Sequence, residues 1–212
     1  MNTVLRAPYF FALWCNGSTS DSGSACQGSN PCGATMKLQR ITTATDTAWE
    51  VLLPLYKTAF PIEERRNDED LLYTVAHCPE MVCNAIYVQQ QVVGMSIYWN
   101  LDGFVYLEHF MILPEYRNQG IGAWVLQQLA NSTTLPRILE VEPASDALTQ
   151  RRVAMYERNG YGVVCTDYYQ ESYRKGGQGI GLWLMCSESL AKARIEQMAQ
   201  CIKEQVYFRF WK

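Results

Sequence analysis

The chain has 212 residues, of which 48% are hydrophobic and 18% charged, a composition that can bury a sizeable core. This length favours one domain plus an extension. The formal net charge of −3 gives no basic field for binding nucleic acid, so we expect no nucleic-acid partner. No apolar run reaches the roughly 18 residues that span a bilayer, so we expect no membrane partner.

Histidine and cysteine usage argues against a metal centre. The only histidines are His77 and His109, and none of the eight cysteines forms a C-x-x-C pair, so we expect no bound metal. His109 lies in an apolar run and is expected to be a packed core residue. We expect the cysteines to be reduced and the protein to be cytoplasmic, with a disulfide framework as the alternative.

Residues 1–35 differ in composition from the rest of the chain. They carry three cysteines and a Ser/Gly-rich stretch over residues 16–30, without helical or strand periodicity. The segment 28–31, Gly-Ser-Asn-Pro, can be encoded by GGT-TCG-AAT-CCN, which resembles the T-loop consensus of a tRNA gene. We expect residues 1–35 to be a disordered tail or a spurious extension upstream of Met36, and residues 36–212 to be the folded domain.

The segment from Met36 to residue 113 predicts strands and two helices. Thr43 or Thr45 is expected to cap the first helix, which Pro54 should kink or split. The charged turn 62–66 is either a solvated face or the border of an acceptor site. The predicted strands are residues 37–41, 81–90, 91–98 and 104–113, and the second helix is residues 68–76.

A glycine-bearing loop follows the central strand and Pro114. Its sequence places an R-x-x-G-x-G pattern directly before an amphipathic helix over residues 120–131. A helix N-terminus with glycines offers unpaired N–H groups and a positive dipole end, which together bind phosphate. We therefore expect a phosphate-binding loop formed by Arg117, Asn118, Gln119, Gly120, Ile121, Gly122 and Ala123.

The rest of the chain continues the alternation. A strand over 137–142 precedes a helix that Ser145 or Asp146 should cap and that ends near Asn159-Gly160. Strands are expected over 161–168 and 181–186, separated by a polar loop over 170–179. Ser187 is expected to cap a last helix that runs to about residue 207.

Two motifs together resemble the GNAT (Gcn5-related) N-acetyltransferases. One is the R-x-x-G-x-G loop, and the other is Tyr156-x-x-x-Gly160-Tyr161 at the end of the next helix. The resemblance covers residues 36–212. It implies an α/β (α+β) fold with a central, mixed, mostly antiparallel sheet of about six to seven strands flanked by helices and splayed between its fourth and fifth strands.

The resemblance also implies direct transfer of an acetyl group from acetyl-CoA, the co-substrate, to a primary amine in a ternary complex. The 117–123 loop would hold the pyrophosphate, and the main chain of Phe110 and Ile112 would pair with pantetheine. The N–H of Met111 or Ile112 would polarise the thioester carbonyl. Tyr156 resembles the general acid of the family, with a structural tyrosine as the alternative.

The general base is left open between Glu108 and Glu140. We favour Glu108, a carboxylate in an otherwise apolar strand, because burial would raise the pKa of its carboxyl group. It could instead be tied to an arginine or to His109 for structure, and some family members use only water. Thr149 stands where the family has a CoA-contacting asparagine.

Two further questions stay open in the sequence. The alternative function is a catalytically silent GNAT-fold module that binds acyl-CoA or a partner. The chain is expected to be a monomer or a homodimer, and the acceptor amine is not specified.

Overall fold

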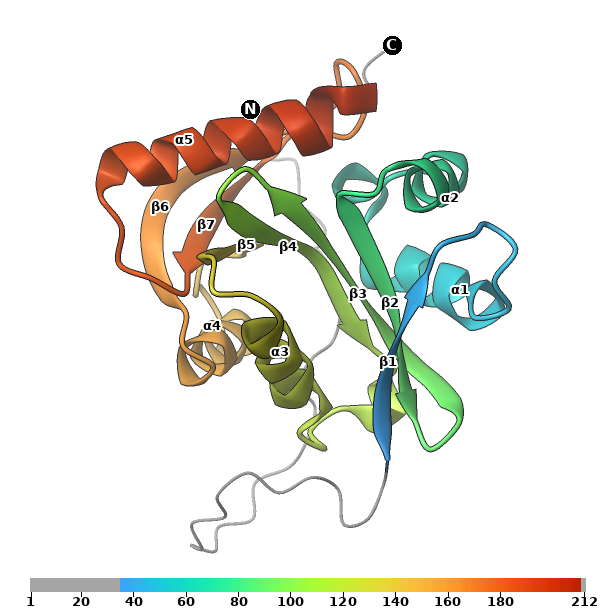
Figure 1. Ribbon diagram of the computed structural model, residues 1–212. Helices are drawn as coiled ribbons and strands as arrows, with labels where there is room; N and C mark the ends of the chain where they lie inside the picture. The colour runs from blue at the N-terminus through green and yellow to red at the C-terminus, as the bar shows by residue number, and fades with distance from the viewer. Residues whose placement is uncertain (1–34, 211–212) are drawn as a thin grey trace, which may run out of the picture.

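The computed structural model describes residues 35–210, which form one sheet covered by helices (Figure 1). The sheet has the order β1-β2-β3-β4-β5-β7-β6, and its neighbours are antiparallel except for the parallel pair β4–β5. This confirms the predicted mixed, mostly antiparallel sheet. The strands are β1 Met36–Ile41, β2 Met81–Val88, β3 Gln91–Leu101, β4 Phe104–Ile112, β5 Arg137–Val141, β6 Gly162–Gln170 and β7 Ile180–Cys186.

Helices cover both faces of this sheet. The buried residues of α1 (Trp49–Ala59), α2 (Asp68–His77) and α5 (Lys192–Ile202) pack in one hydrophobic cluster. Those of α3 (Ile121–Ser132) and α4 (Ala147–Arg158) pack in a second cluster. Side chains alternate across a strand, so Phe110 and Ile112 of β4 join the second cluster while Met111 joins the first.

Local sequence predicted some helix ends and missed others. Asp146 caps α4 in a capping box with Thr149, as expected from the Ser145-or-Asp146 prediction. Neither Thr43 nor Thr45 caps α1, and the N–H of Ala48, the residue before the helix, donates to the Asp46 carboxylate at 2.9 Å. The helix also continues through Pro54 rather than splitting there.

The C-terminal region departs most from expectation. Ser187 does not cap a helix, because its hydroxyl accepts a hydrogen bond from Arg137 N at 2.9 Å, and α5 begins only at Lys192. A wider helical turn, Lys203–Tyr207, follows α5 and carries the chain back over the sheet. That segment brings Val206 and Tyr207 to the centre of the molecule.

Several expectations concern the chain as a whole. The prediction for residues 1–35, together with Cys15, Cys26 and Cys32, lies almost wholly outside the described residues. The five described cysteines are free thiols. Within residues 35–210, no helix combines the length and the apolar character needed to cross a membrane.

Candidate active site

The parallel strands β4 and β5 separate in the middle of the sheet. They pair over only three positions, from Val105 opposite Arg137 to Leu107 opposite Leu139. Glu108 and Glu140 are the next residues on the two strands, so both carboxylates lie where the strands diverge. A cavity at this point is lined by Phe60, Glu64, Glu108, His109, Phe110, Glu140, Val141, Glu142, Arg152, Tyr156, Gln170 and Leu182.

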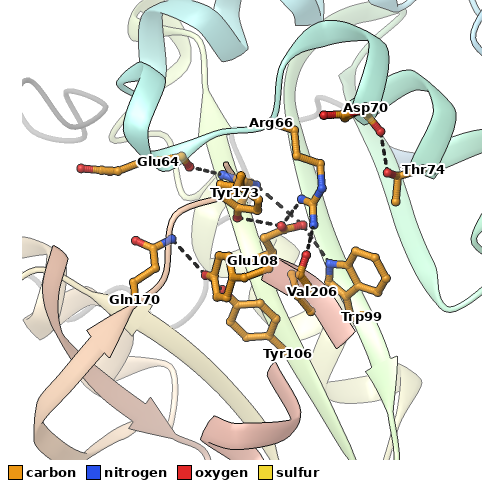
Figure 2. Close-up of polar contacts among 12 residues, drawn as sticks. Glu64, Arg66, Asp70, Thr74, Trp99, Tyr106, Glu108, Gln170, Tyr173 and Val206 are labelled. Carbon is orange, nitrogen blue, oxygen red and sulfur yellow. Dashed lines mark hydrogen bonds and ion pairs between the residues drawn. The ribbon is translucent and has the colours of Figure 1, made fainter. Parts of the chain in front are cut away.

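Glu108 is held in a buried polar network (Figure 2). Its carboxylate forms an ion pair with Arg66, and the two side chains are 0% and 1% exposed, respectively. Trp99 Nε1 and Tyr173 Oη each donate a hydrogen bond to it at 2.8 Å. Arg66 Nη2 in turn donates to the Val206 carbonyl at 3.0 Å. The network ties four separate segments to one carboxylate.

The expectation that burial would raise the pKa of Glu108 is wrong. Burial does disfavour the ionised form, but the Arg66 guanidinium, with help from His109 and Trp99, outweighs it and holds the carboxyl pKa below its ordinary value. Glu108 therefore stays ionised at neutral pH and has little tendency to take up a proton. The structure therefore contains the alternative that sequence analysis left open, in which Glu108 is paired with an arginine.

Glu140 has a different environment. Its Oε2 accepts hydrogen bonds from Tyr106 Oη at 2.9 Å and from Tyr207 Oη at 2.6 Å. Its Oε1 has no hydrogen-bond partner among residues 35–210. Burial raises the pKa of this carboxyl to about 7, against the opposing effect of the hydroxyls of Tyr168, Tyr207 and Tyr106, of which Tyr168 acts most strongly. Glu140 is thus close to half ionised at neutral pH.

The turn after α1 contributes a carboxylate that the sequence did not single out. Glu64 is only 4% exposed and Arg66 is also buried, so the expectation of a solvated face is wrong for these two residues. Burial, followed by repulsion from Glu142 and Glu63, raises the pKa of Glu64 to about 9. Nothing in the local sequence distinguishes Glu64 from the exposed Glu63 beside it.

The α4 side of the cavity carries Arg152 and Tyr156. Arg152 forms an ion pair with Glu142, and burial raises the pKa of Glu142 against that pairing. Tyr156 packs edge-on against Tyr161 at a ring distance of 6.0 Å. Burial raises the pKa of Tyr156 to about 12, so its hydroxyl is protonated at neutral pH. A protonated hydroxyl in this cavity is available as a proton donor.

A second groove adjoins the predicted phosphate loop. Asn118 and Gly120 have left-handed backbone conformations, with φ of 60° and 78°, which turn the loop into the first turn of α3. Arg117 Nε donates to the Ile112 carbonyl at 2.9 Å and so holds the loop against β4. Residues that line the groove on this side are Ile112, Tyr116, Arg117, Asn118, Gly120, Ile121, Gly122 and Ala123.

Not every predicted loop residue lines the groove. Gln119 is not among the lining residues, and its amide donates to the Glu115 carbonyl at 2.9 Å. Thr149 lines neither cavity, and its hydroxyl accepts a hydrogen bond from Asp146 N in the capping box of α4. The opposite wall was missed by sequence analysis, although its signal is visible as basic residues about two turns apart on one helix. That wall is formed by Arg151, Arg152, Ala154, Met155, Arg158 and Asn159 of α4 and its end.

Comparison with known proteins defines the class of this fold. A sequence model of the acetyltransferase (GNAT) domain matches residues 81–163. A GNAT-family acetyltransferase structure from Bacteroides thetaiotaomicron is 30% identical, with a TM-score of 0.74, and the match covers 81% of this chain and 98% of that one. The chain therefore belongs to the GNAT acetyltransferase family. No curated protein matches it.

More distant structures share the fold alone. A GNAT acetyltransferase from Elizabethkingia anophelis, solved with acetyl-CoA bound, is 12% identical with a TM-score of 0.51, covering 73% of this chain and 98% of that chain. A spermidine N-acetyltransferase chimera from Vibrio cholerae and hSSAT is 17% identical with a TM-score of 0.53, and the match covers 71% of this chain and 93% of that chain.

Proposed function

We propose that this protein is an N-acetyltransferase that moves an acetyl group from acetyl-CoA to a primary amine by direct transfer in a ternary complex. Residues 36–212 would form the catalytic domain, and its free cysteines suit the cytoplasm. The observation that carries the proposal is the cavity between β4 and β5. It brings Glu140, with a carboxyl pKa near 7, together with the protonated hydroxyl of Tyr156.

Acetyl-CoA would bind in the groove beside the loop. The first N–H groups of α3, at Ile121 to Ala123, have no intrahelical partner and suit the pyrophosphate, with Arg117 adding positive charge. Arg151 and Arg158 on the facing wall would add further contacts to phosphate. The β5 side of β4 beyond Leu107 pairs with no strand among residues 35–210, which leaves its main chain available to pantetheine.

The proton transfers follow from the pKa values. Glu140 would take the proton of the bound ammonium, because about half of its carboxyl groups are ionised at pH 7 and a larger fraction at higher pH. The neutral nitrogen would then attack the thioester carbonyl, so that a C–N bond forms and the C–S bond breaks. The N–H of Met111 or Ile112 would stabilise the carbonyl oxygen. Tyr156 would give its proton to the departing thiolate of CoA.

This proposal reverses the order of the two candidate bases. Glu108 is held ionised by Arg66 and is a weak proton acceptor, so it would organise the cavity rather than act as the base. Its network also fixes the carbonyl of Val206, the residue before Tyr207, whose hydroxyl donates to Glu140. Glu108 would therefore act by positioning the C-terminal segment.

Release of CoA thiol from acetyl-CoA by the full-length protein, with and without a panel of primary amines, tests this proposal. An N-acetyltransferase releases thiol only when an amine is present, in amounts equal to the N-acetyl product. A silent acyl-CoA-binding module would show thermal stabilisation by acetyl-CoA and no amine-dependent release. That second outcome would reject catalysis while keeping the cofactor site.

A further inference from the structure

The cavity between β4 and β5 contains more acidic than basic groups. Glu108 is paired with Arg66, and Glu142 is paired with Arg152. Glu64 and Glu140 line the same cavity, but neither forms an ion pair with any residue from 35 to 210. Arg152 also acts on Glu64, although burial and the neighbouring carboxylates outweigh it. Among the residues that the structure describes, Glu64 and Glu140 are therefore left without an ion-pair partner.

Both of these carboxylates have an oxygen that lacks a hydrogen-bond donor. Glu64 Oε2 and Glu140 Oε1 are shielded from solvent and have no partner within the described part of the chain. Figure 2 shows the Glu64 side chain extending away from the Arg66–Glu108 pair, so it takes no part in that network. Buried polar atoms are normally satisfied, because leaving them unpaired costs free energy. A bound ligand with two donor groups would satisfy both oxygens.

Part of the remaining lining of the cavity is apolar, beside the polar side chains of His109, Tyr156 and Gln170. Phe60, Phe110 and Leu182 line it together with the two carboxylates. Such side chains suit a methylene chain and offer no hydrogen bond to a polar linker. The cavity thus combines two carboxyl groups, those of Glu64 and Glu140, with a partly hydrophobic wall.

We propose that the acceptor is an aliphatic diamine, whose reacting amine binds at Glu140 and whose second ammonium group binds at Glu64. The inference rests on the proposed acetyl transfer and specifies its substrate class. When Glu140 takes the proton of the reacting amine, that end of the ligand and Glu140 both become neutral. Glu64 then remains as the counter-ion of the second ammonium, which stays charged throughout the reaction.

Glu64 also supplies a signature of diamine binding. With the cavity empty, its carboxyl has a pKa of about 9 and is mostly protonated at pH 7.5. An ammonium beside it favours the ionised form, so diamine binding releases a proton to the buffer. Calorimetry in two buffers of different ionisation enthalpy measures this release independently of catalysis.

The test compares the binding of 1,4-diaminobutane and butylamine to the full-length protein by calorimetry at pH 7.5. One buried charge-assisted contact predicts that the diamine binds at least about tenfold more tightly. Glu64→Gln should remove this difference and the proton release at Glu64. Glu63→Gln, an exposed neighbour in the same turn, should keep both. Equal binding of the two amines, or a preference that survives Glu64→Gln, would overturn the proposal.

Two controls keep the outcomes distinct. Glu64→Asp retains the charge and should retain the diamine preference, and the thermal unfolding of each variant shows whether it is folded. Thiol release with butylamine as good as with the diamine, without a binding preference, would reject the diamine inference alone. Diamine binding that depends on Glu64 without any thiol release would reject the acetyl transfer and leave the binding site.

Discussion

Replacing Glu140 by Gln separates its chemical role from its structural one. Glutamine has the same shape and can still accept the hydrogen bonds from Tyr106 and Tyr207, but it cannot take up a proton. General-base catalysis contributes about 10²–10⁴-fold to a rate. We therefore expect Glu140→Gln to lower kcat/KM for the amine by about 10²–10⁴-fold, with no change in the affinity for acetyl-CoA.

The pH dependence sharpens this prediction. Because the Glu140 carboxyl has a pKa of about 7, about a tenth of the molecules are ionised at pH 6 and about nine tenths at pH 8. The kcat/KM of the wild type should rise about tenfold between these pH values. Thiol release measured from pH 5.5 to 8.5 gives the profile. A Glu140→Gln variant with wild-type activity and the same profile would refute the role of Glu140.

The folding stability of the same variant provides an independent check. The pKa of Glu140 is raised in the folded protein from 4.5 to about 7, so folding favours the protonated form. Its contribution to stability therefore falls as pH rises through that window. The difference corresponds to about 3 kcal/mol at most, which Gln removes. Glu140→Gln should be at least as stable as the wild type at pH 8.

Three further substitutions test the surrounding structure. Glu108→Gln breaks the buried pair with Arg66 and should lower the free energy of unfolding by about 3–5 kcal/mol in urea titrations, so unchanged stability would contradict the structural role. Gly122→Glu puts a carboxylate in the phosphate groove and should abolish the thermal shift by acetyl-CoA, whereas the exposed Gln127→Glu in the same helix should keep it. Tyr156→Phe removes the proton donor and should lower kcat by about 10²-fold or more without raising the KM for acetyl-CoA, and a kcat equal to that of the wild type would exclude Tyr156 as the acid.

Local patterns predicted the elements that position the site. Alternating and helical periodicity gave the seven strands and the helices, and the glycine loop marked the start of α3. The Asp146 cap is also a local signal, because the side chain bonds within its own first turn. These features depend on residues close together in sequence.

The electrostatics of the site could not be predicted in the same way. Glu108 and Arg66 are separated by 42 residues, and the Val206 carbonyl that holds Arg66 lies 140 residues farther along the chain. The pKa of a carboxylate depends on such partners, and its direction reverses when an arginine is present. A lone glutamate in an apolar strand therefore indicates burial but does not indicate the sign of its pKa change.

The C-terminal turn illustrates the same limit. Periodicity predicted one amphipathic helix ending near residue 207, and its apolar residues are indeed buried. The Tyr207 hydroxyl nevertheless donates to Glu140, 67 residues away, and receives the Gln170 amide at 2.9 Å. Only the folded sheet brings the end of the chain to the point where β4 and β5 separate.

The most direct test follows the acetyl group itself. The full-length protein is incubated with acetyl-CoA that carries ¹³C in its acetyl group, first alone and then with 1,4-diaminobutane, and intact protein and small molecules are weighed by mass spectrometry. Direct transfer predicts that the label appears in N-acetylated amine and that the mass of the protein does not change. Labelled acetyl groups on the protein that chase into the amine, or no labelled amine at all, would contradict direct transfer in a ternary complex.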